Sequence, residues 1–163
     1  MQVFASKYPD AVAGMVLLDP PPRSFILGQD YKDLGGMAER MTAEWQSIAD
    51  SADAQGKAKS AFFRMIASEH REMFGQTAKF IAKISTFGDM PLTVLAAGKP
   101  NPAFGELAEK FQSYWVEQSR TLSQKSTRGK FLLAEKSSHF LYMDAPDLVT
   151  ESILSVVQEV RTK

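Results

Sequence analysis

Three short and nearly continuous apolar runs occur along the chain, AGMVLLD (13–19), PLTVLAAGK (91–99) and GKFLLAEK (129–136). Their apolar residues follow one another instead of alternating with polar ones. Strands that are covered on both faces have this pattern, as in a parallel sheet that lies between helices. The pattern therefore predicts three buried parallel strands.

Segments with helical spacing of apolar residues lie around these runs. One is FGELAEKFQSYW (104–115), and another extends over 149–160. Asp144 is a candidate N-cap for the final helix, with Pro146 in its first turn. The opening MQVFASKYP predicts a helix that ends before Pro9. Helices and strands thus alternate, which indicates the α/β class.

The stretch 20–90 departs from that alternation. It begins with three prolines and continues with helical patterns rich in Met and Phe, MAERMTAEWQSIAD, KSAFFRMIASEH and REMFGQTAKFIAKIS. It carries no strand pattern, which predicts a helical cap inserted between two strands. The predicted organisation is a core formed by 1–19 and 91–163, with the cap at 20–90.

Composition restricts the function classes. The chain has 163 residues, 44% hydrophobic and 23% charged, and is expected to form one globular domain. Its formal net charge is zero, which argues against nucleic acid or an anionic membrane surface as a partner. No cysteine is present, which excludes disulfides, thiolate metal sites and a cysteine nucleophile. No signal peptide is visible, and no apolar run approaches the ~20 residues that span a bilayer. A cytoplasmic location is the expectation.

Three segments carry a resemblance to a known family: FASKYPDAVAGMVLLDP, PLTVLAAGK and GKFLLAEKSSHFLYMDAPDLVTESILSVV. In this order they resemble the C-terminal part of an α/β-hydrolase, the superfamily of esterases, epoxide hydrolases and haloalkane dehalogenases. The first is similar to the end of the helix after the nucleophile elbow with the sixth strand, and the second to the seventh strand. The third is similar to the eighth strand, the catalytic histidine loop and the final helix. The resemblance implies about three parallel strands flanked by helices, with an inserted cap.

His139, in SSHFLYMD, is the candidate general base. It follows the predicted strand 129–136, and open α/β sheets place their sites at the C-terminal ends of strands. The resemblance implies that its imidazole takes a proton from the nucleophile or from an attacking water. The alternative is a surface-loop histidine beside a helix N-terminus. His70, in IASEHREMF, is expected to be a solvated helix residue.

The candidate acid is Asp19. Members of the superfamily carry the acid after the seventh or the sixth strand. After the seventh strand this chain reads AAGKPNPAF, and no carboxylate occurs before Glu106. Asp19 stands after the sixth strand in LLDPPP; the alternative is that it only caps the turn into the prolines. Asp144 and Asp147 are interpreted as carboxylates at a helix N-terminus.

No residue of the sequence is a candidate for the nucleophile. The chain contains no G-x-S-x-G elbow, and Ser6, Ser137 and Ser138 lack the glycines of one. The resemblance places the nucleophilic serine about ten residues before Met1. The expected protein is therefore the cap and C-terminal part of an α/β-hydrolase, with His139 but without the nucleophile. It is expected to need no cofactor or metal, and residues 1–163 alone are expected to have little or no catalytic activity.

The intact enzyme is expected to act on a small apolar ester-like substrate. Neither nucleic acid nor a membrane is an expected partner, whereas self-association through 13–19 is expected because this strand would lack a neighbour. The alternative is a non-catalytic small α/β domain that binds an apolar ligand or a protein partner through its cap. An in-frame G-x-S-x-G before Met1 would favour the enzyme.

Overall fold

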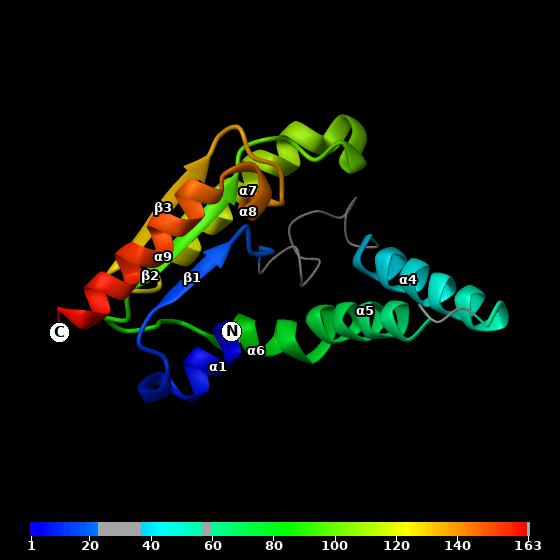
Figure 1. The fold of residues 1–163 in the computed structure, drawn as a ribbon, viewed down its shortest axis with the longest axis horizontal. Coiled ribbons are helices and arrows are strands. Elements are labelled where there is room, and N and C mark those ends of the chain that lie inside the picture. The colour runs from blue at the N-terminus through cyan, green and yellow to red at the C-terminus, as the bar shows by residue number, and fades with distance from the viewer. Residues whose placement is uncertain (23–36, 57–59, 163) are drawn as a thin grey trace. The chain divides into compact units, whose positions relative to one another are not determined.

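The computed structural model describes residues 1–22, 37–56 and 60–162 (Figure 1). It divides into two compact units, Met1–Pro22 with Ile84–Lys163, and Arg23–Lys83. The first unit holds a sheet with helices, and the described part of the second is helical. The predicted cap also includes 23–36 and 57–59, which lie outside the described residues.

The sheet consists of β1 (Met15–Leu18), β2 (Leu92–Ala97) and β3 (Gly129–Ala134). All pairings are parallel and the order is β1-β2-β3, so β2 is central and entirely buried (Figure 1). Each of the three apolar runs contains one strand. The predicted α/β class and the three parallel strands are confirmed.

Helices cover both faces of this sheet (Figure 1). One face packs against α1 (Gln2–Lys7) and α7 (Ala108–Ser123), and the other against α9 (Pro146–Arg161). The first core comprises Ala5, Met15, Leu92 and Val94, with Leu17 and Leu122 beside them. The second comprises Leu95, Ala97, Ala134, Leu141 and Val149, with Val16 and Leu18 beside them. Because alternate strand residues enter opposite cores, both kinds of position must be apolar.

The helix ends differ from the predictions in two places. The helix predicted over 104–115 begins later, because the short helix η3 (Pro102–Leu107) is interrupted at Gly105, whose φ is 53°. The prediction of Asp144 as an N-cap is wrong: Asp144 ends the short helix α8 (Leu141–Asp144), and Ala145 precedes α9. The N-terminal helix ends at Lys7, before Pro9 and the short helix η1 (Pro9–Ala11), as predicted.

The second unit contains α4 (Met37–Ala54), α5 (Ser60–Glu72), the π-helical turn η2 (Met73–Thr77) and α6 (Ala78–Lys83). Trp45 of α4 stacks on Phe63 of α5, with ring centroids 6.3 Å apart. His70 lies edge-on to Trp45, with ring centroids at 6.1 Å, and its burial lowers its pKa. His70 is thus a helix residue that is only partly exposed to solvent.

No helix within the described residues combines the length and the apolar character that crossing a membrane requires.

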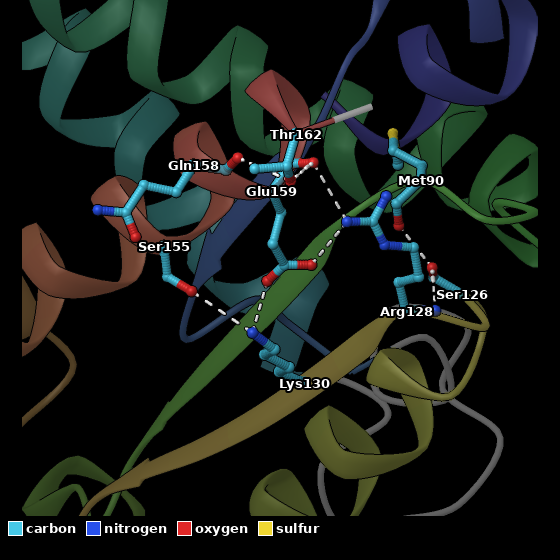
Figure 2. A network of polar contacts seen from close by, with 8 residues as sticks. All are labelled: Met90, Ser126, Arg128, Lys130, Ser155, Gln158, Glu159 and Thr162. Carbon is cyan, nitrogen blue, oxygen red and sulfur yellow. Dashed lines mark hydrogen bonds and ion pairs between the residues drawn. The ribbon is translucent and has the colours of Figure 1, made fainter.

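A polar network joins the start of β3 to the end of α9 (Figure 2). Glu159 accepts a hydrogen bond from Arg128 at 3.0 Å and another from Lys130 at 2.5 Å. The hydrogen bond from Lys130 is the largest cause that holds the pKa of Glu159 below its ordinary value. Burial opposes it, and the charge of Lys130 and the contact with Arg128 lower the pKa further. The network therefore ties the last turns of α9 to the start of the edge strand β3.

Replacing Glu159 by glutamine is expected to lower the free energy of unfolding by about 0.5–1 kcal/mol, because the pairs are partly solvated. Since the pKa of Glu159 is lowered in the fold, the stabilisation is present above its unfolded pKa and is lost as pH falls through the folded pKa. Denaturant melts at neutral and acidic pH measure this. Glu151→Gln, which removes an exposed carboxylate elsewhere on α9, is the control. Equal effects of both substitutions would contradict the assignment.

Candidate functional site

Asp19 lies at the carboxyl end of β1, where the chain leaves the sheet. Its backbone N–H donates to the carbonyl of Leu95 at 2.7 Å, and its φ of 44° then turns the chain into the prolines. The side chain stays at the strand end, where Oδ1 accepts the N–H of Ala97 at 2.9 Å. Asp19 is only 4% exposed. A positive φ is costly for a residue other than glycine, and here it directs a buried carboxylate across the end of the sheet.

His139 lies in the loop between β3 and α8. The loop reaches back over the end of β2, because Gly98 has no side chain: a Cβ there would lie 2.4 Å from the Cα of Glu135. This approach allows the N–H of Lys99 to donate to the carbonyl of Ser137 at 3.0 Å. On the other side, the N–H of Ser138 donates to Oδ2 of Asp144 at 2.7 Å. Both bonds hold the two residues that precede His139.

The structure brings the two predicted site residues together. Nδ1 of His139 lies 2.8 Å from Oδ2 of Asp19, although β2 separates the strands that carry them. The Asp19 side chain is 5% exposed and that of His139 is 57% exposed. No other hydrogen bond joins the His139 ring to the part of the chain that the structure describes. Nε2 is thus left to act on a group outside the pair.

The carboxylate changes the protonation of the ring. The hydrogen bond to Asp19 raises the pKa of His139 above its ordinary value of 6.5, burial opposes this, and the charge of Asp19 adds to the rise. Because the pKa is raised in the fold, the stabilisation from the charged pair is complete below the unfolded pKa. It is lost as pH rises through the folded pKa. Above that pH the neutral ring keeps its proton on Nδ1, since Asp19 accepts it, and Nε2 becomes a base.

Aromatic side chains flank the histidine. The ring of Trp115, on α7, meets it edge-on at a centroid distance of 6.5 Å, and that of Phe140 at 5.7 Å. Trp115 was predicted only as part of an apolar helix face, and the sequence contains no signal that places it beside His139. Phe140 and the neighbouring Tyr142 and Met143 are more than half exposed. Within the described residues, the His139 ring is thus flanked by aromatic rings, one of which, Phe140, is exposed.

None of the serines Ser6, Ser137 and Ser138 occupies the position of a nucleophile beside His139. Ser137 donates to the carbonyl of Ser138, and Ser138 Oγ accepts the N–H of Phe140, so both bond within the loop. Ser6 lines a cavity of about 520 Å³ together with Pro91. Since Pro91 precedes β2, this cavity lies at the end of the sheet opposite His139. None of the three is bonded to His139.

Within the described ranges 1–22, 37–56 and 60–162, no group of three acidic or histidine side chains is arranged to hold a metal ion. Glu106, the first carboxylate after β2, is exposed on η3 and takes no part in the pair. The pair consists of the His139 imidazole and the Asp19 carboxylate, which also bonds to the end of β2 at Ala97.

Comparison of the chain with protein families, curated proteins and solved structures gave no match.

Proposed function

We propose that this chain carries the acid and the general base of a hydrolytic site of the α/β-hydrolase type. The observation that carries the proposal is the contact between Nδ1 of His139 and the buried carboxylate of Asp19. It lies at the carboxyl ends of parallel strands, where such sheets place their sites. The resemblance of the segments around both residues supports the same assignment.

The chemistry follows from the two ring nitrogens. Nε2 of His139 takes the proton of a hydroxyl as its oxygen attacks the ester carbonyl, and returns that proton to the leaving alcohol. Asp19 holds Nδ1–H in place and stabilises the imidazolium that forms in between. Neither step needs a cofactor. The apolar rings of Trp115 and Phe140 favour a small apolar ester as the substrate.

The attacking hydroxyl is proposed to come from outside residues 1–163. No G-x-S-x-G occurs in the sequence, and no described serine is bonded to His139. The unit Arg23–Lys83 is proposed to be the cap of the intact enzyme. A cytoplasmic location remains a prediction from the sequence.

A fluorophosphonate probe, which reacts with activated serine hydroxyls, tests the proposal in the chain extended by its in-frame upstream coding sequence. We expect labelling at a G-x-S-x-G serine, and a loss of at least about 100-fold in the labelling rate with His139→Ala. Residues 1–163 alone are expected to hydrolyse short-chain aryl esters no faster than their His139→Ala variant. An absent elbow, or labelling that does not depend on His139, would refute the proposal. Turnover by residues 1–163 that disappears with Ser6, Ser137 or Ser138 would instead show a misplaced nucleophile.

A second candidate is the non-catalytic binding domain. Phe62 and Met65 on α5 and Phe80 on α6 are each more than two-fifths exposed. Exposed large apolar side chains favour a ligand or protein partner for the second unit. Failure of the labelling experiment would favour this function.

A further inference from the structure

At Ala97, the last residue of β2, the backbone of β1 no longer provides the hydrogen-bond partners of β2. Alternate residues of a parallel strand face the same neighbour, so Ala97 is the next residue after Leu95 to face β1. The Leu95 carbonyl accepts from Asp19 N–H, and the next donor in that series would be residue 21. Residue 21 is Pro21, which has no N–H. The carbonyl of Ala97 therefore needs another donor.

Gln112 on α7 supplies that donor. Its Nε2 lies 2.7 Å from the carbonyl oxygen of Ala97, and the side chain is buried, with 9% of Gln112 exposed. The N–H of Ala97 faces the same side and donates to Oδ1 of Asp19 at 2.9 Å. Two side chains thus replace the strand that would otherwise continue beside Ala97. One of them is the acid of the proposed site.

We propose that Gln112 is a positioning residue for the Asp19–His139 pair, acting through the backbone of Ala97. With the Gln112 amide in place, the N–H of Ala97 points at Oδ1 of Asp19 and leaves Oδ2 directed at His139. Without the amide, a buried carbonyl has no partner, and the end of β2 shifts to reach water or another donor. The same shift moves the N–H that orients the carboxylate. The catalytic meaning of the pair rests on the proposed function, whereas the positioning itself does not.

Gln112→Met tests the inference, because methionine has a similar length and no donor. We expect the pKa of His139, followed by NMR titration of its ring, to move toward the ordinary value by about half a unit or more. In the extended chain, the rate of fluorophosphonate labelling is expected to fall as well. The matched control is Ser123→Ala on the same helix, which removes a buried 2.7 Å hydrogen bond to the carbonyl of Arg120. This variant should melt at a lower temperature without changing the titration.

A His139 titration that is unchanged in a folded Gln112→Met protein would overturn the inference. If that variant does not fold, Gln112→Asn replaces it, since this side chain keeps a buried amide but is one methylene too short to make the bond. An unchanged titration in Gln112→Asn would overturn the inference equally. Because the titration uses no substrate, its outcome is independent of whether the labelling experiment supports the hydrolase.

Discussion

Asparagine in place of Asp19 is expected to move the ring proton of neutral His139 from Nδ1 to Nε2. Oδ1 of Asp19 accepts the N–H of Ala97, and only the oxygen of an amide can take over that position. The NH₂ group of the Asp19→Asn side chain must then face Nδ1 and donate to it. Nδ1 becomes the acceptor, and Nε2 carries the proton. The outward nitrogen thereby loses the lone pair that a general base needs.

Carbethoxylation by diethyl pyrocarbonate measures this change, because the reagent attacks only an unprotonated ring nitrogen. At a pH where His139 is neutral, we expect its rate of modification to fall by about tenfold or more in Asp19→Asn. The pKa of His139 should also fall, since burial lowers it and the carboxylate no longer opposes burial. His139→Ala identifies the contribution of His70. Asp144→Asn, which keeps an oxygen for the N–H of Ser138, should leave the rate unchanged. Equal rates in wild type and Asp19→Asn would contradict the geometry of the pair.

The sheet and the pair could be predicted because their signals are local. A strand covered on both faces is apolar along most of its length, and β1, β2 and β3 are, apart from Thr93 and Lys130. Parallel strands have their carboxyl ends at the same end of the sheet. Residues that follow two such strands therefore lie at that end, even when β2 separates the strands. Asp19 follows β1 directly, and His139 follows β3 after a loop of four residues. Their proximity required only the right strands and a common direction.

The supports of the pair depend on tertiary contacts that no local pattern reveals. Asp144 has the spacing of a helix N-cap, but its carboxylate instead binds the loop that precedes His139. Gln112 lies in a helix whose apolar face was recognised, and nothing in its neighbours marks it as the donor for Ala97. Pro21, which has no N–H, is the sequence feature that leaves the Ala97 carbonyl without a donor from the β1 side. It can be interpreted in this way only when the register of β1 against β2 is known.

The free edge of β1 leads to the second large expected effect. Within the described residues the sheet has three strands, and β1 pairs only with β2. The N–H groups of Val16 and Leu18 point away from β2, because those of Met15 and Asp19 point toward it. An apolar strand with unpaired backbone groups is a template for a strand of another chain. We therefore expect the isolated chain to self-associate at micromolar concentration through residues 13–19.

Val16→Pro tests this edge selectively, because it removes an outward N–H and leaves the donors toward β2 intact. We expect sedimentation velocity to show the variant shifted toward monomer, with a dissociation constant raised by about tenfold or more. Leu133→Pro makes the matched change on the outer edge of β3, since the N–H of residue 133 also points away from β2. It should leave the association unchanged, and both variants should still melt cooperatively. A wild-type chain that stays monomeric would show that the β1 edge is covered in solution. Association that survives Val16→Pro but not Leu133→Pro would move the interface to β3, because these two edges are the ones that the described sheet offers.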